Sequence, residues 1–127
     1  MERQHARSGS PFESTIGFSR AVRVGSTIAV SGTAPVWSDG TVDPDPAVQA
    51  RRCWEIMLTA LEELGGSVDD VIRTRQFIVD AADADAVGLV HGEVFGSVQP
   101  ASTMVVVKEL LDPRWKVEME LDAVLAD

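Results

Sequence analysis

Apolar and acidic residues alternate strictly near the end of the chain, over residues Lys116–Ala123. The acidic positions between the apolar ones are Glu118, Glu120 and Asp122. Alternation with a period of two is typical of a strand that packs one face on the core. Its acidic face is then either a solvated edge or the wall of a pocket.

Four other segments have the composition of strands. They are Phe18–Val24, Thr27–Gly32, Val71–Asp80 and Thr103–Lys108. The first two flank Gly25, and a glycine at a tight connection permits the positive φ that hairpin turns require. The first pair is therefore predicted to form a β-hairpin. The last two strands of the chain are predicted to be Thr103–Lys108 and the alternating segment, with a turn at Asp112-Pro113 between them.

Two segments are predicted to be helical. Asp45 suits an N-cap and Pro46 suits the first helical position. Apolar residues then recur at spacings of three and four, which is typical of one buried stripe of a helix, and Gly65-Gly66 mark its end. A second helix is expected from Asp83 to about Phe95.

The predicted order is β-β-α-β-α-β-β, which fits an α+β, two-layer sandwich with two helices on one face of a mixed sheet. If alternation holds in Val71–Asp80, its helix-facing side chains are those of Ile72, Thr74, Gln76 and Ile78. The uncovered face is then expected to carry Arg73, Arg75, Ser102, Met104, Glu118, Glu120 and Asp122. Such a mixed face is a natural interface between copies of the chain.

The 127 residues suggest a single domain, residues 1–127, with residues 1–11 expected to be loose. A net charge of −9 argues against binding nucleic acid through phosphates. No apolar run is long enough to span a membrane, and no signal peptide is apparent. One cysteine, Cys53, fits a reducing compartment, so a cytoplasmic location is expected.

Histidine and cysteine offer little chemistry in this sequence. His91 shares a helical face with apolar residues, which favours a packing role, and no second histidine stands at a ligand spacing. Cys53 lies on the apolar stripe of the first helix and is expected to be buried and inert. No metal site is therefore predicted.

Several short motifs together resemble the RidA/YjgF family, also called the L-PSP endoribonuclease family. They are Gly17–Val22, Val30-Ser31-Gly32, the strand end at Asp80, Pro100-Ala101 and Val117-Glu118-Met119-Glu120. The resemblance runs from about Phe12 to Val124. It implies a chorismate-mutase-like fold and a homotrimer with a ligand pocket at each subunit interface.

The resemblance also implies an activity and a set of site residues. Members with the full motif set are enamine/imine deaminases, which form a keto acid and ammonia without metal or organic cofactor. Glu118 matches the glutamate that positions water, and Ser31-Gly32 are kept. Three positions differ from the family pattern: Phe18 replaces a tyrosine, Ser102 replaces the carboxylate-binding arginine, and Met104 replaces a cysteine. An asparagine position on the second helix falls on Gly88.

Arg75 has two possible roles, which the sequence leaves open. It could bind an anionic small-molecule ligand with the charge that Ser102 lacks, or it could neutralise interface carboxylates. Three functions are weighed: an imine hydrolase, a non-catalytic ligand-binding or chaperone-like trimer, and a ribonuclease. The net charge speaks against the ribonuclease.

Overall fold

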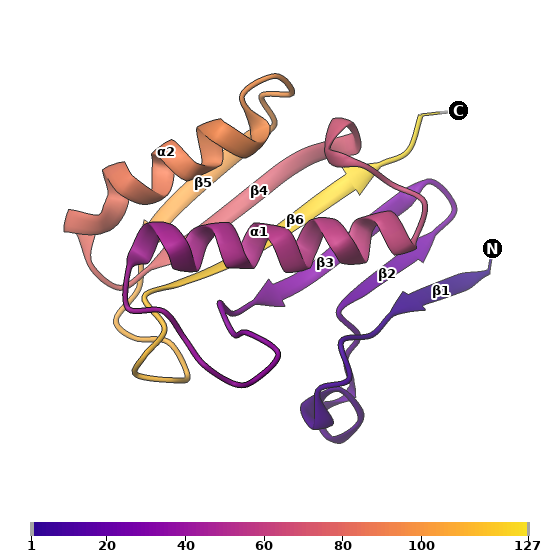
Figure 1. Ribbon diagram of the computed structural model, residues 1–127. Coiled ribbons are helices and arrows are strands. Elements are labelled where there is room, and N and C mark those ends of the chain that lie inside the picture. The colour runs from indigo at the N-terminus through magenta and orange to yellow at the C-terminus, as the bar shows by residue number, and fades with distance from the viewer. Residues whose placement is uncertain (1, 127) are drawn as a thin grey trace.

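The computed structural model describes residues 2–126, which form a six-stranded sheet with two α-helices (Figure 1). The strands are β1 (Arg3–Ala6), β2 (Ala21–Val24), β3 (Thr27–Thr33), β4 (Val71–Ile78), β5 (Ala101–Val106) and β6 (Val117–Val124). The helices are α1 (Pro46–Glu63) and α2 (Ala84–Phe95), with short helical turns η1 (Glu13–Gly17), η2 (Val68–Asp70) and η3 (Ala81–Asp83). The sheet order is β1-β2-β3-β6-β4-β5.

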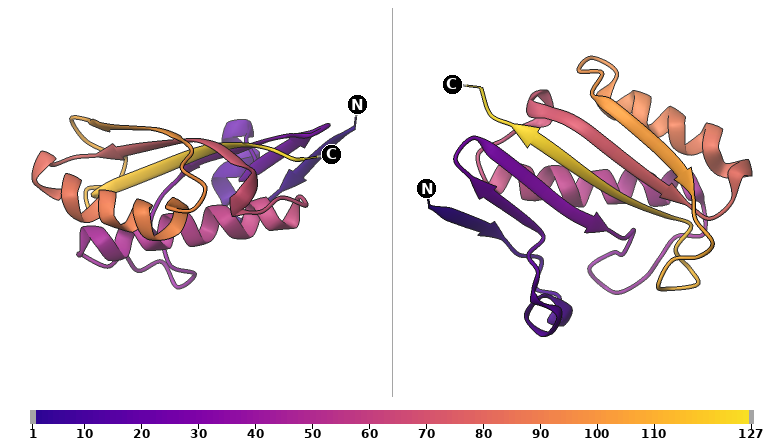
Figure 2. Two further views of the ribbon diagram at one scale, coloured as in Figure 1. Left: turned by 90° about the horizontal axis from the view of Figure 1, so that it is seen from above. Right: turned by 180° about the vertical axis from the view of Figure 1, so that it is seen from behind.

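Both helices cover one face of the sheet and leave the other face uncovered (Figure 2). The alternation in β6 is confirmed, because Val117, Met119 and Leu121 are fully buried on the helix side. They pack with one stripe of α1 that includes Trp54 and Met57. The predicted α+β sandwich is therefore confirmed. Within the described residues, neither helix is long and apolar enough to cross a membrane.

The ends of α1 follow the sequence signals. The side chain of Asp45 accepts hydrogen bonds from the backbone N–H groups of Ala47 and Val48, and Pro46 occupies the first turn. At the other end, Gly65 has a φ of +90°, a conformation that side-chain-bearing residues rarely adopt. These caps fix where α1 begins and ends over the sheet.

The expectation of a loose N-terminus is wrong for Arg3–Ala6, which pair antiparallel with β2. The sheet therefore gains a strand before the predicted hairpin. This strand was missed because its sequence is polar and only Ala6 is buried. The segment Phe18–Arg20 lies just before β2 and is not part of the strand.

The predicted face assignments of β4 and β5 need two corrections. Ile72 is 52% exposed, since the register of β4 against β6 shifts between Val71 and Arg73, and Val71 is buried instead. Ser102 and Met104 lie on the helix side, not on the uncovered face. Strand β5 runs parallel to β4, where Ser102 pairs with Thr74 and Met104 with Gln76, and paired residues project to the same face.

Candidate functional site

Glu118 lies against the backbone of the neighbouring strand at Gly32. Strand β3 has a register shift between Val30 and Thr33, where it pairs with β6. A methyl group built on Gly32 would lie 3.0 Å from Oε1 of Glu118. The absence of a side chain at Gly32 therefore makes room for the carboxyl group.

Arg20 is a member of this site that the sequence did not single out. Its Nη2 donates a 3.0 Å hydrogen bond to the carbonyl oxygen of Gly32. Its guanidinium carbon lies 5.6 Å from the centroid of the Phe18 ring, within the range of a cation–π contact. The sequence does contain a signal for Arg20. It stands two residues after Phe18 in a segment that continues into β2, and residues two apart in extended backbone project to the same side.

Ser31 joins the segment before β2 to the end of β3. Its hydroxyl donates a 2.6 Å hydrogen bond to the carbonyl oxygen of Ser19, and its backbone N–H donates to that of Arg20. The hydroxyl proton is thus used within the chain. Ser31 positions Phe18 and Arg20 beside Gly32, and together with Glu118 these residues form what we call the Glu118 cluster.

Burial shifts the pKa values of the two ionisable groups in this cluster, Glu118 and Arg20. Burial raises the pKa of Glu118; the positive charge of Arg20 opposes the rise, and the negative charge of Glu120 adds to it. Burial lowers the pKa of Arg20, which the carboxylates of Glu13 and Glu118 oppose. Glu118 is therefore a carboxyl group that holds a proton more readily than an exposed one, as proton transfer requires.

Arg75 lies on the uncovered face and is paired with carboxylates of β6. Its Nη1 is 3.3 Å from Oε1 of Glu120 and 3.1 Å from Oδ2 of Asp122. Both partners are about as accessible as Arg75 itself. This geometry corresponds to the neutralising role; a direct contact with a ligand remains a prediction.

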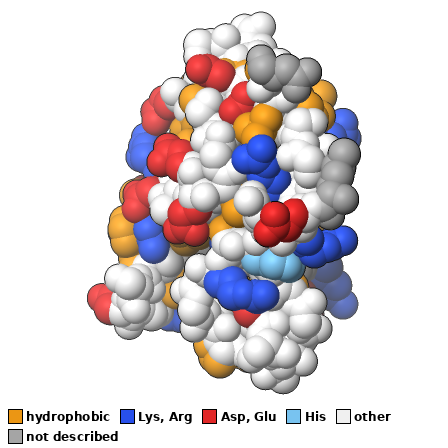
Figure 3. Space-filling model, turned by 90° about the vertical axis from the view of Figure 1, so that its right-hand side faces the viewer, with side chains coloured by type: hydrophobic (Ala, Val, Ile, Leu, Met, Phe, Trp, Pro, Cys, Tyr) orange, Lys and Arg blue, Asp and Glu red, His pale blue; other side chains and the backbone are white. Residues whose placement is uncertain are grey.

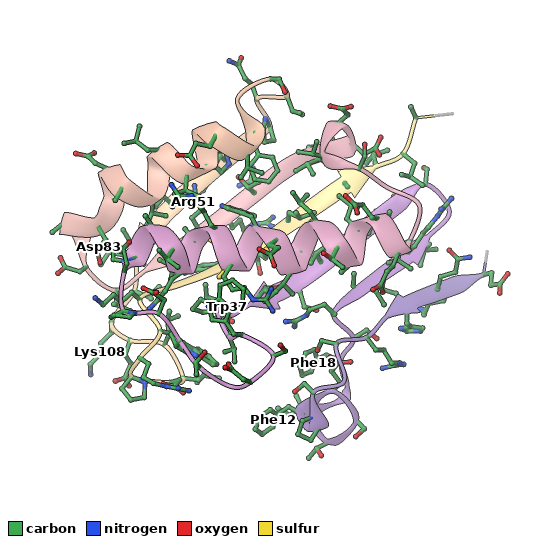
Figure 4. All side chains as sticks on the ribbon, in the orientation of Figure 1. Phe12, Phe18, Trp37, Arg51, Asp83 and Lys108 are labelled. Carbon is green, nitrogen blue, oxygen red and sulfur yellow. The ribbon has the colours of Figure 1, made fainter. Side chains whose placement is uncertain are left out.

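An open hollow of about 980 Å³ connects several of the predicted residues. Its wall includes Phe18, Ser31, Arg75, Glu120, Arg3 and His5. Glu118 and Gly32 lie outside this wall, so the hollow adjoins the Glu118 cluster through Phe18 and Ser31. Figure 4 shows Phe18 where the chain leaves η1, beyond the end of the sheet. Ser102 and Met104 do not line the hollow.

Ser102 belongs to a second polar group on the helix side of the sheet. Its oxygen accepts a 2.7 Å hydrogen bond from the Thr74 hydroxyl and a 3.4 Å one from Nε2 of Gln76. The Thr74 oxygen is also 2.8 Å from Nε2 of His91, whose pKa is lowered by burial. His91 packs edge-on against Trp54 as well, with ring centroids 5.7 Å apart, in agreement with its expected packing role.

Other reactive groups take no part in these sites. Cys53 is fully buried, and burial raises the pKa of its thiol well above the ordinary value. Across residues 2–126, no three histidine, cysteine or carboxylate side chains come together as a metal site would require.

Comparison with known proteins identifies the fold and the family. The family model described as Endoribonuclease L-PSP matches residues 9–125. An uncharacterised protein of Streptomyces coelicolor is 37% identical over 121 residues, which are 94% of this chain and 90% of that protein.

Two solved structures share the architecture. Rv2704 of Mycobacterium tuberculosis, a member of the YjgF/YER057c/UK114 family, is 38% identical with a TM-score of 0.90, over 98% of this chain and 100% of that one. TdcF of E. coli, solved with bound serine, is 27% identical with a TM-score of 0.82, over 96% and 94%. Since the family model spans almost the whole sequence, the chain belongs to the endoribonuclease L-PSP family, also known as RidA/YjgF.

Proposed function

We propose that the protein binds a small metabolite between copies of the chain and hydrolyses an imine or enamine there. The observation that carries this proposal is the position of Glu118, a half-buried carboxyl group beside the Gly32 backbone. Burial raises the pKa of Glu118, which suits a group that takes and returns protons during a reaction. The serine bound to the related TdcF supports a small ligand.

The reaction consumes one water molecule. Glu118 takes a proton from water while the water oxygen bonds to the imine carbon and the C=N electron pair moves to nitrogen. Glu118 then gives this proton to the nitrogen and is a carboxylate again. The resulting carbinolamine then loses ammonia as its O–H becomes the new C=O. An enamine such as 2-aminoacrylate enters the same route after its methylene carbon is protonated. No metal or organic cofactor is proposed.

The separation of Glu118 from Ser102 favours a site built from two copies. Strand β4 lies between β6 and β5, so two strand spacings, about 10 Å, separate the two residues across the sheet. Their side chains also project to opposite faces. If both contact one ligand, as the family resemblance implies, different subunits must supply them.

The outer edge of the sheet supports this assembly. Strand β5 is an edge strand, and its Val105 and Val106 are 43% and 55% exposed. An exposed apolar edge is unfavourable in an isolated chain, because it leaves unpaired backbone groups open to other strands. We propose that a homotrimer covers it.

The alternative is a trimer that binds its ligand without turnover. It is favoured by Ser102, which offers a hydroxyl where the family's deaminases have a guanidinium group, and a hydroxyl cannot replace that charge. Ribonuclease activity has less support. Acidic and basic side chains are interspersed on the side of the molecule seen in Figure 3, which shows no continuous basic stripe.

The test is keto-acid release from 2-aminoacrylate and a cyclic imino acid, both generated in situ. Wild type is expected to accelerate release, and Glu118→Ala to remove the acceleration. If wild type accelerates none of these substrates yet binds them, the protein is a binding module. Gel filtration with light scattering tests the trimer, and a monomeric mass would contradict the shared site.

A further inference from the structure

Arg20 has hydrogen-bonding capacity that the chain does not use. A guanidinium group carries five N–H donors. In residues 2–126, its Nη2 donates to Gly32, while its buried Nε–H has no partner. Its Nη1 makes no hydrogen bond within the described part of the chain and is not among the buried atoms that lack partners. Arg20 thus keeps donors available beside the Glu118 carboxyl.

The charge of Arg20 is also incompletely compensated. It lies near Glu13 and Glu118, whose charges influence its pKa. It nevertheless forms no ion pair within 4.0 Å in the described part of the chain. Glu13 instead accepts hydrogen bonds from the backbone and hydroxyl of Ser8. A partly buried cation without a contacting carboxylate favours an external anion.

Arg75 is a weaker candidate for the same role. Two carboxylates contact its guanidinium group, so a ligand carboxylate would have to displace one of them. Phe18, by contrast, contacts Arg20 through its ring, with the guanidinium carbon 5.6 Å from the ring centroid, and Nη1 of Arg20 makes no hydrogen bond in residues 2–126.

We infer that Arg20 binds the carboxylate of a small keto or imino acid and replaces the arginine that the family carries at the position of Ser102. This inference rests on the proposed function and names the ligand class of that site. Arg20 donates to the carbonyl oxygen of Gly32, and Glu118 lies against the same glycine, so one small acid at this point would contact Arg20 through its carboxylate and Glu118 near its reacting carbon. The charge is supplied from the segment before β2 instead of from β5.

Ligand binding at Arg20 is then coupled to protonation of Glu118. The charged groups that shift the pKa of Glu118 are Arg20 and Glu120, and the charge of Glu118 in turn raises the pKa of the buried Cys53 thiol on α1, which is neutral. The negative charge of a bound carboxylate offsets the positive charge of Arg20. This raises the pKa of Glu118 further, so Glu118 takes up a proton as the acid binds.

Calorimetry with pyruvate and uncharged pyruvamide tests the inference. Arg20→Gln should weaken pyruvate binding by about 10- to 100-fold, the loss expected for charge-assisted hydrogen bonds, and weaken pyruvamide binding by a clearly smaller factor, because only a neutral hydrogen bond is lost. Arg51→Gln is the matched control, since it removes one positive charge from the exposed pair with Glu93. Arg20→Lys keeps the positive charge but lacks the planar guanidinium group with its paired N–H donors. This variant should bind pyruvate with an affinity between those of wild type and Arg20→Gln.

The outcomes separate this inference from the proposed function. Equal pyruvate affinity in wild type and Arg20→Gln overturns the role of Arg20 but does not contradict the proposed function. Failure of wild type to bind either probe contradicts both. If Arg20→Gln does not fold, Arg20→Lys decides, and wild-type affinity there overturns the inference. Titrations in two buffers should show proton uptake with pyruvate that Glu118→Gln abolishes; its persistence in that variant contradicts the coupling.

Discussion

Thr74 donates a 2.7 Å hydrogen bond to Ser102, from the buried centre of β4 to the exposed edge strand β5. A hydroxyl has a single proton, so Thr74 then accepts its 2.8 Å bond from the Nε2–H of His91. The residue at the family's arginine position is in this way linked to α2 through the sheet. This chain of hydrogen bonds orients the Ser102 hydroxyl, whose own proton points to no partner within residues 2–126.

Removing the hydroxyl of Thr74, at the centre of this series of hydrogen bonds, should destabilise the protein. Thr74→Val keeps the size of the side chain and leaves His91 without its partner. We expect the free energy of unfolding in urea to fall by about 1–3 kcal/mol, the cost of an unsatisfied buried polar group. Thr59→Val is the control, since that hydroxyl bonds to Glu55 on the exposed side of α1. Equal effects of the two substitutions would show that the hydrogen bonds from Thr74 to Ser102 and His91 do not stabilise the protein.

Restoring the arginine on β5 should increase turnover. Ser102 is exposed, so an arginine side chain has room there, and Ser102→Arg should lower the unfolding free energy by about 0.5–1.5 kcal/mol because Thr74 loses its hydrogen-bond acceptor. With a second guanidinium group in the shared pocket, keto-acid release from 2-aminoacrylate is expected to rise. Ser97→Arg adds the same charge at an exposed position outside both sites. A rate no higher than that of Ser97→Arg argues that the rest of the pocket is not competent.

Adding one methyl group at Gly32 should displace the Glu118 carboxyl. The new Cβ would lie 3.0 Å from Oε1, closer than ordinary contact, and the flexible end of Glu118 must move. Gly32→Ala is expected to lose imine hydrolysis with little change in thermal stability. Gly92→Ala meets no atom within 4 Å and should stabilise α2 by about 0.5–1 kcal/mol. Wild-type kcat in Gly32→Ala would place the reaction elsewhere.

Glu118 should also give the stability of the protein a measurable pH dependence. Its pKa is raised above the ordinary 4.5, so the folded state binds the proton more tightly than the unfolded state. The stability that this proton contributes is complete below pH 4.5 and is lost as the pH rises through the folded-state pKa. Relative to Glu118→Gln, wild type should therefore weaken over that range in urea titrations. A constant difference, or one of opposite sign, contradicts the raised pKa.

Most of the fold could be predicted because strong local signals agree with it. The cap at Asp45, the glycines after α1 and the alternation in β6 each determine a local structure that tertiary packing then keeps. Strand β1 was missed because it lies at the edge of the sheet and needs no apolar face.

The candidate site was harder to predict because its geometry depends on pairing between distant strands. Residues Thr103–Lys108 contain no alternation that assigns a face, and only the parallel register with β4 places Ser102 and Met104 on the helix side. Arg20 lies within the motif Gly17–Val22, but the motif alone does not show which of its side chains reaches the site. The contact of Arg20 with Gly32 arises only when the segment before β2 meets the end of β3.

The edge position of β5 has a consequence for how this scaffold can change. Ser102 is exposed at the last strand of the sheet, whereas Glu118 lies on β6 between two paired neighbours and beside buried core residues. A substitution of the exposed Ser102 therefore meets little core packing, whereas a substitution of Glu118 itself has to be accommodated between β3 and β4. Of the two residues proposed to share one ligand, the one on β5 can thus vary more freely while the strands around Glu118 keep their packing.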